Sequence, residues 1–266
     1  MRNYINTQTI FDFEKLGLSA ECFYKKHSPK TPYHNWNHAL NVADCIKDMF
    51  KHDFGHETHY ALLIAAYWHD AVYVPGNSDN EAKSASALWA LICSINIYPL
   101  DPILTDICRK AFYYIKKTTV KDHLMSENIS TPLGYLLDAD LNSLGTPSFE
   151  VFVQNQDRII LENGGNFETD KYKCADFLKQ FLTCREHIYH TEYGRTKWEA
   201  NARYNIEKYV ALYVKKDEPV NVDTLFNQKL SEIIERRVDE EMKKISIEDI
   251  ITKVVEAHFN KFYGKE

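Results

Sequence analysis

Apolar residues recur at helical spacing through most of this 266-residue chain. Four of them follow His38 at the i+4, i+7, i+8 and i+11 positions of one helical face: Val42, Cys45, Ile46 and Met49. Only 9 glycines and 8 prolines interrupt the sequence, and no run of residues is typical of a β-strand. We therefore expect an all-α fold, in the form of a compact helical bundle.

The breaks in this periodicity divide the chain into a series of expected helices. Thr31-Pro32 and Asn35 suit the start of a helix that runs to about residue 49. Val74-Pro75-Gly76-Asn77 should end the next helix, which is expected over about 60–69. Further helices are expected at about 79–95, 102–117, 132–143, 148–161, 171–189 and 197–214. These helices would form one domain over residues 1–214.

The composition changes at Lys215-Lys216-Asp217-Glu218-Pro219. Beyond this point, residues 222–244 and 245–262 have the pattern of two charged amphipathic helices. No glycine-rich linker separates them from the preceding helices, so we expect residues 215–266 to be an extension that packs on the same domain. Two alternatives are a partner surface, through which the chain could form a homo-oligomer, and an extension into solvent.

Composition and charge narrow the classes of partner and the compartment. Apolar residues make up 44% of the chain and charged residues 26%, which is typical of soluble globular proteins. The net charge of -6 argues against a non-specific nucleic-acid binder, although local basic groups could still hold a small phosphate. No window has the roughly 20 apolar residues needed to span a bilayer, residues 1–18 do not resemble a signal peptide, and the six cysteines are scattered. We expect a cytoplasmic protein with reduced cysteines and no membrane association.

Asp140 interrupts a stripe of leucines. It lies at i+7 from Leu133 and i+4 from Leu136, on the face that the helix expected over 132–143 should bury. Asp138 is rotated away from this face by about 200°. Because a lone buried carboxylate is costly, Asp140 should face a positive group, which could be a metal ion or a salt-bridge partner.

Histidines occupy comparable positions on two other expected helices. His69 closes the apolar stripe that begins at Leu62, and Asp70 follows where that helix should end. His38 heads the apolar face of the preceding helix. One buried histidine is more often a satisfied core residue than a ligand, but two histidines and two carboxylates on three helices favour a metal site. Such ligands suit Mn, Fe, Co, Ni or Zn better than Ca or Mg alone, and Mg could bind in addition.

The order of these residues resembles the HD-domain superfamily of metal-dependent phosphohydrolases. Four segments carry the resemblance: Tyr33-His34-Asn35-Trp36-Asn37-His38, Trp68-His69-Asp70-Ala71-Val72-Tyr73, Asp79-Asn80-Glu81 and Asp138-Ala139-Asp140-Leu141. They are similar to a bacterial branch described as predicted HD-superfamily phosphohydrolases, over about residues 31–145 and more weakly to 199–203. The resemblance implies an all-helical HD-domain bundle over residues 1–214. It also implies that His38, His69, Asp70 and Asp140 are the metal ligands.

This chain departs from the branch at two places. The branch tends to carry a Thr-x-x-His segment before the last aspartate, whereas the spacing from Thr118 and Thr119 to His123 is one or two residues longer. The region around Asp157 and Arg158 is also atypical. The first departure puts the role of His123 in doubt.

A metal ion held in this way can activate water and polarise a phosphoryl oxygen. The expected activity is therefore hydrolysis of a phosphate ester of a small metabolite or nucleotide. His34, at i−4 from His38, is a candidate for leaving-group chemistry, and Glu81 and Asp79 are candidates for catalytic work, with helix capping as the alternative for both carboxylates. Lys83 and His123 are candidate substrate contacts. Four other cations could hold phosphate but are more typical of a solvated surface: Arg109, Lys116, Lys117 and Arg203.

Two other functions are compatible with the same residues. Some HD-domain relatives are di-iron oxygenases, and here His34 and His123 could hold a second metal. A non-catalytic nucleotide-binding sensor could keep the fold without turnover, but such a sensor has little need for buried charges.

Overall fold

The computed structural model describes residue 13 and residues 15–27, 30–49, 55–94, 102–125 and 131–213. These residues belong to one unit, Met1–Val214. The extension expected over 215–266, with its two helices and its possible role in a homo-oligomer, lies outside the described residues.

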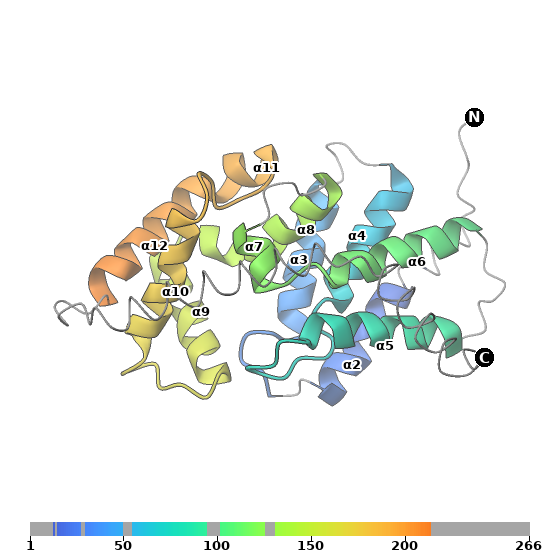
Figure 1. The fold of residues 1–266 in the computed structure, drawn as a ribbon, viewed down its shortest axis with the longest axis horizontal. Coiled ribbons are helices and arrows are strands. Elements are labelled where there is room, and N and C mark those ends of the chain that lie inside the picture. Colours follow the sequence, from blue (N-terminus) through green and yellow to red (C-terminus); the bar gives the residue numbers. More distant parts are fainter. Residues whose placement is uncertain are drawn as a thin grey trace, which may run out of the picture. The chain divides into compact units, whose positions relative to one another are not determined.

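Every regular element in the described part of the chain is helical, which confirms the expected all-α class (Figure 1). In chain order the elements are α2 (Ala20–His27), α3 (Trp36–Met49), α4 (His56–Trp68), α5 (Asn80–Ser94), α6 (Pro102–Ile115), α7 (Val120–Met125), α8 (Thr131–Asp140), the 3₁₀ helix η2 (Leu141–Gly145), α9 (Phe149–Glu162), α10 (Lys171–Thr183), α11 (Glu192–Gly194), the π-helical segment η3 (Arg195–Glu199) and α12 (Ala200–Tyr213).

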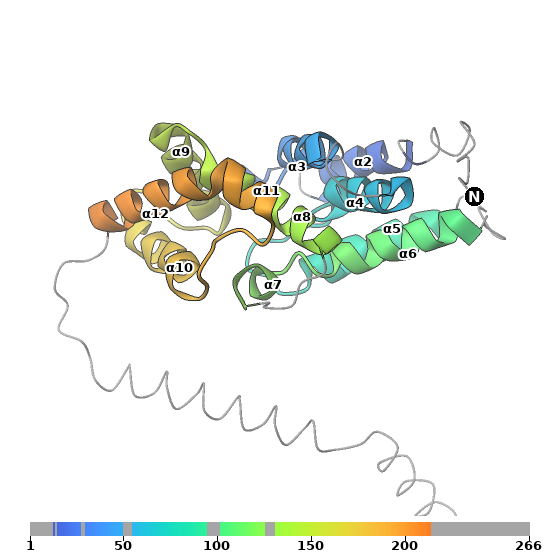
Figure 2. The same cartoon turned by 90° about the horizontal axis from the view of Figure 1, so that it is seen from above.

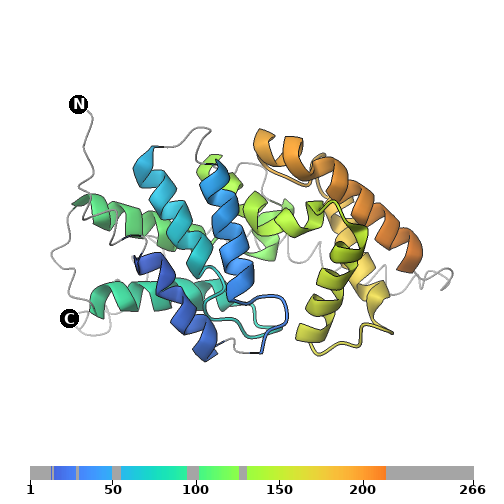
Figure 3. The same cartoon turned by 180° about the vertical axis from the view of Figure 1, so that it is seen from behind.

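Helix α4 is the centre of the first half of this unit. Nine of its 13 residues are buried, because α3, α6 and α8 all pack against it (Figure 3). A helix enclosed on all sides is apolar around its whole circumference, which explains the run from Ala61 to Trp68. The C-terminal end of α4, where His69 follows, is therefore held inside the protein.

Helices α9, α10 and α12 gather on the other side of α8 (Figure 2). Helix α12 packs against α10, α9 and η2, and Phe152 of α9 meets Tyr209 of α12 edge to face, with ring centroids 5.8 Å apart. Helix α8 thus lies between two groups of helices. This position explains why α8 is buried on more than one face.

Two of the expected helices end or begin elsewhere. The helix expected over 171–189 stops at Thr183, because the backbone N–H groups of Ile188 and Tyr189 donate to the carboxylate of Glu199 instead of to helix carbonyls. The helix expected over 197–214 starts as the π-helical segment Arg195–Glu199, and regular α-helix begins at Ala200. Helices α2 and α7 were not predicted, since each is short.

Other expectations are met by specific contacts. Asn35 begins α3, where its Oδ1 accepts from the N–H groups of Asn37 and His38 at 3.0 and 3.3 Å. All six cysteines lie in the described residues and are free thiols. Among the described helices, none is both long and apolar enough to cross a bilayer.

Burial of His59 makes stability depend on pH. Burial, together with the charges of His56 and Lys47, lowers the pKa of His59 to about 4. An unfolded chain binds this proton near pH 6.5, so between pH 6.5 and 4 the unfolded state holds more protons than the folded state. The contribution of neutral His59 to the free energy of unfolding is therefore fully present above about pH 6.5 and is lost as the pH is lowered toward 4.

We expect His59→Gln to reduce this dependence. In urea unfolding with a chelator present, the free energy of unfolding of the unmodified chain should drop between pH 7 and pH 5 by about 1 kcal/mol more than that of the variant, after allowance for solvent screening. Equal drops in the two proteins would show that His59 is not held neutral.

Candidate metal centre

Three helices bring His38, His69 and Asp140 together. His38 lies in the first turn of α3, His69 directly follows α4, and Asp140 is the last residue of α8. The C-terminal ends of α4 and α8 and the N-terminal end of α3 therefore meet at this point.

The ligand-type atoms of these three residues all lie within 4.8 Å of one another. His38 Nε2 is 2.9 Å from Asp140 Oδ1 and 3.3 Å from His69 Nε2. His69 Nε2 is 3.4 Å from Asp140 Oδ1. Two imidazole nitrogens and a carboxylate oxygen at this separation can bind one transition-metal ion after small adjustments. The expected metal-binding group is thus present for these three residues.

A backbone contact orients the ring of His69. Its Nδ1 lies 2.9 Å from the carbonyl oxygen of Ala66, one turn earlier in the chain. A carbonyl only accepts, so Nδ1 carries a hydrogen, and in the neutral ring Nε2 then presents its lone pair to the cluster. This tautomer is the one that a metal ligand requires.

Asp70 lies at the edge of the same cluster. Its Oδ2 is 3.0 Å from His69 Nε2 and 3.9 Å from His38 Nε2. Its backbone N–H donates to the hydroxyl of Tyr24 at 3.2 Å, which fixes the chain where α4 has ended. Asp70 can join the three clustered residues as a fourth ligand, as the sequence predicts, if its side chain moves inward.

The charges in the cluster depend on one another. Burial disfavours the charged forms, but Asp70 and Asp140 raise the pKa of His69 well above its ordinary value. Conversely, burial is outweighed by the imidazoles of His69, His123 and His38, which hold the pKa of Asp140 well below its usual range. Asp140 therefore stays ionised, and the imidazoles that face it balance its charge.

His123 contacts the other oxygen of Asp140. It comes from α7, and its Nε2 lies 3.0 Å from Asp140 Oδ2. The sequence placed His123 among the candidate substrate contacts. In the structure it is buried against Asp140 and also lines the cavity described below.

A second polar pair stands beside the centre. The ring of His34 stacks on Tyr73, with centroids 4.2 Å apart, and its Nδ1 is hydrogen-bonded to Glu162 Oε1. Glu162 Oε2 also accepts from the backbone N–H groups of Tyr33 and His34, at 2.9 and 3.0 Å. Burial lowers the pKa of His34, but the bond to Glu162 outweighs it and raises that pKa above its ordinary value. Glu162 therefore fixes the ring and leaves Nε2 as its available atom.

Three candidate site residues follow the His69-Asp70 pair in the sequence, and only one of them lies at the cavity. The loop after Tyr73 folds back on α5, since Val72 N–H donates to Ser84 Oγ at 3.0 Å. This brings Glu81 to the cavity, where burial raises its pKa. Asp79 and Lys83 instead pair with each other at 2.8 Å and are exposed.

The other lysine and arginine residues that were candidates for holding phosphate also lie away from the cavity. Arg203 Nε pairs with Glu199 at 2.8 Å, and Lys117 Nζ lies 3.5 Å from Asp122. Lys83, Arg109, Lys116, Lys117 and Arg203 are all outside the set of residues that line the cavity.

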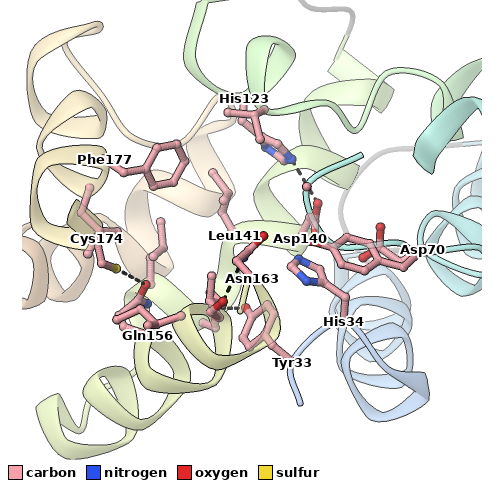
Figure 4. Close-up of a pocket in the computed structure, with 18 of the residues that line it drawn as sticks. Tyr33, His34, Asp70, His123, Asp140, Leu141, Gln156, Asn163, Cys174 and Phe177 are labelled. Carbon is pink, nitrogen blue, oxygen red and sulfur yellow. Dashed lines mark hydrogen bonds and ion pairs between the residues drawn. The ribbon is translucent and has the colours of Figure 1, made fainter. Parts of the chain in front are cut away.

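A cavity of about 600 Å³ opens beside the metal centre. His34, Asp70, Glu81, His123 and Asp140 line one end. The opposite end is apolar and is formed by η2, α9 and α10. Figure 4 shows Phe177, Cys174 and Gln156 across the cavity from Asp140 and His34, with Leu141 between the two groups. The metal centre is thus reached from a pocket large enough for a drug-sized ligand.

No protein-family model matches this chain, and no match is found among curated proteins. The resemblance to the HD superfamily therefore stays a prediction from the segments around His38, His69 and Asp140.

Two residues were not predicted from the sequence: Gln156, which lines the cavity, and Glu162, which holds the ring of His34. Gln156 lies four residues from both Phe152 and Ile160 on the buried face of α9, so the periodicity that singled out Asp140 also singles out Gln156. Glu162 carries no comparable signal, because its partners Tyr33 and His34 are more than 120 residues away in the chain.

Asp138 is a structural residue on the far side of α8. It is fully buried, and burial raises its pKa to about 6. Its carboxylate accepts from the backbone N–H of His190 at 2.6 Å and from the N–H and hydroxyl of Thr191 at 2.8 and 2.6 Å. Asp138 therefore holds the segment before α11, while Asp140 faces the histidines.

Proposed function

We propose that this protein is a metal-dependent phosphohydrolase of the HD superfamily, which hydrolyses a phosphate monoester of a small molecule. The observation that carries the proposal is the group His38, His69 and Asp140, whose ligand atoms lie within 4.8 Å of one another beside a cavity of about 600 Å³. The resemblance of the surrounding segments to that superfamily supports the same reaction class.

The donor set fits a divalent transition metal. His38 Nε2, His69 Nε2 and Asp140 Oδ1 would hold the ion, with Asp70 as a fourth ligand, and the two imidazoles favour Mn, Fe, Co, Ni or Zn. When bound, such an ion lowers the pKa of water and polarises a phosphoryl oxygen. The hydrogen bond from His69 Nδ1 to Ala66 supports this assignment, because in the neutral ring it leaves Nε2 as the atom that can bind a metal.

His34 and Glu81 supply the proton transfers in this proposal. Glu81 lines the cavity and accepts a proton from the attacking water, whose oxygen forms a bond to phosphorus. The bond between phosphorus and the ester oxygen breaks, and His34 delivers a proton from Nε2 to that oxygen. The products are the alcohol and inorganic phosphate. Glu162 is a positioning residue, because it acts through the ring of His34.

The unmodified 266-residue chain tests the proposal. We expect it to bind about one transition-metal ion per chain and to release inorganic phosphate from phosphate monoesters when reloaded with Mn, Fe, Co, Ni or Zn in turn. Metal analysis and a phosphate assay measure the two quantities, and a chelator should abolish the release. Absence of bound metal together with absence of phosphate release would overturn the proposal. Consumption of dioxygen by the iron-loaded protein would support a di-iron oxygenase instead.

Replacing Glu162 with glutamine tests the role assigned to His34. The change removes the charge that holds the His34 ring, so kcat should fall about 10- to 100-fold while metal content stays the same. The alkaline limb of the pH–rate profile should also move to lower pH, because His34 must be protonated to donate and Glu162 raises its pKa. Glu168→Gln is a matched control on an exposed glutamate. An unchanged pH profile in Glu162→Gln would contradict this role.

A further inference from the structure

The cavity wall carries few groups that could bind additional phosphates. Its four carboxylates are Asp70, Glu81, Asp140 and Asp170. Among the described lining residues, Lys173 is the single lysine or arginine. Its Nζ pairs with Asp170 at 2.8 Å, and its side chain is 64% exposed. A polyphosphate chain extending away from the metal centre would therefore meet carboxylates and no unpaired lysine or arginine of this wall.

The end of the cavity away from the metal centre is built from apolar side chains. Phe177, Leu178 and Phe181 come from α10, and Ile159 and Ile160 come from α9. Leu141 and Leu144 of η2 continue this surface toward Asp140, and Figure 4 shows Leu141 and Phe177 on the wall beyond Asp140. Apolar surface of this kind binds hydrocarbon by removing it from water.

A buried amide marks one polar point on this apolar wall. Gln156 is 2% exposed, and its Oε1 accepts from Cys174 Sγ at 3.5 Å. Its Nε2 is buried and has no hydrogen-bond partner among the described residues. Because buried polar groups are nearly always paired, this N–H group points to a ligand that offers an acceptor oxygen. The cavity is thus built for a mainly apolar molecule with an occasional polar atom.

We infer that the substrate is a phosphate monoester of a mainly apolar alcohol, with its phosphate at the metal centre and its alkyl or aryl body between Leu141, α9 and α10. This inference rests on the proposed phosphohydrolase function and names its substrate class. Water attacks phosphorus, the ester bond breaks, and the apolar alcohol and inorganic phosphate leave. The absence of an unpaired lysine or arginine among the described lining residues favours this class over nucleoside polyphosphates.

A series of alkyl phosphates of increasing length tests the inference on the metal-loaded 266-residue chain. Phosphate release from methyl, butyl and octyl phosphate should show kcat/KM rising about two- to fourfold per buried methylene group. Octyl phosphate should also be hydrolysed faster than AMP or ATP. Equal kcat/KM for methyl and octyl phosphate, or faster hydrolysis of ATP, would overturn the substrate class and leave the phosphohydrolase function standing.

Phe177 and Phe167 provide a matched pair of variants. Both side chains are 39% exposed, but Phe177 lines the cavity and Phe167 does not. Phe177→Glu should lower kcat/KM for octyl phosphate at least about tenfold and by a larger factor than for methyl phosphate, whereas Phe167→Glu should affect neither. Equal effects of the two variants on octyl phosphate would count against the assigned binding surface.

Binding of unreactive phosphonates separates this inference from the proposed function. Calorimetry should show octylphosphonate binding more tightly than methylphosphonate, with the difference reduced in Phe177→Glu. If no phosphate ester is hydrolysed but this difference is seen, the hydrolase proposal fails and the apolar ligand class is supported. If the two phosphonates bind equally, the ligand class is overturned whatever the activity.

Discussion

Asp140→Asn is expected to remove the bound metal and to lower phosphate release at least about 100-fold. Asp140 is the residue on which the centre depends most, because its two oxygens contact three imidazoles, those of His38, His69 and His123. Asparagine has the same shape but no charge, so it cannot balance a divalent ion or fix all three rings. Metal analysis and the phosphate assay on the purified variant measure both effects.

Asp106→Asn makes the same chemical change at an exposed position of α6 and should leave metal content and phosphate release unchanged. Far-ultraviolet circular dichroism should show that both variants keep their helices, since Asp140→Asn removes a buried charge without changing volume. Retention of one metal ion per chain in Asp140→Asn would show that Asp140 is not a ligand. The assignment of the centre would then fail.

Gly194→Ala is expected to be strongly destabilising, although it lies outside the metal centre. A Cβ at this position would overlap Asp138 Oδ2 and approach Asp138 Cγ to 2.9 Å and Tyr189 Cβ to 3.0 Å. Asp138 cannot move aside without breaking its bonds to His190 and Thr191. The alanine side chain would therefore overpack this site, and the buried N–H groups of His190 and Thr191 would lose their acceptor. Together these effects should reduce the free energy of unfolding by about 3 kcal/mol or more, measured by urea denaturation.

Gly55→Ala is the control for this effect. Gly55 precedes α4 as its N-cap, and a Cβ there would meet nothing within 4 Å. Alanine is a poorer N-cap than glycine, so a loss of up to about 1 kcal/mol is expected. If Gly194→Ala were no less stable than Gly55→Ala, the tight packing of Gly194 against Asp138 would be refuted.

The parts of the centre that could be predicted are those that break a local pattern. Asp140 lies on the apolar stripe of α8, and His69 lies on the apolar stripe at the end of α4. Helical spacing alone locates both residues there. His38 begins such a stripe in α3. These three residues could be singled out without knowing how the helices pack, because each is a polar residue on the apolar stripe of a single helix.

The remaining features depend on packing between distant segments. Glu162 reaches His34 only because α9 ends beside the segment that precedes α3. Asp138 lies off the leucine stripe, yet it is buried, because η2, α11 and their neighbours cover the other side of α8. Asp79 and Lys83 flank Glu81 in the sequence, but the first turn of α5 directs only Glu81 to the cavity. Spacing within one helix carries no information on these contacts.

The enclosed position of α4 bears on how the metal would be exchanged. A helix held by α3, α6 and α8 keeps its place through apolar packing, without any contribution from an ion. His69 is anchored to that helix by Ala66, so the ring should stay aimed at the centre after the ion leaves. Such preorganisation separates metal loss from unfolding. One preparation of the folded chain could therefore be stripped and refilled with different metals, and their activities could be compared on the same scaffold.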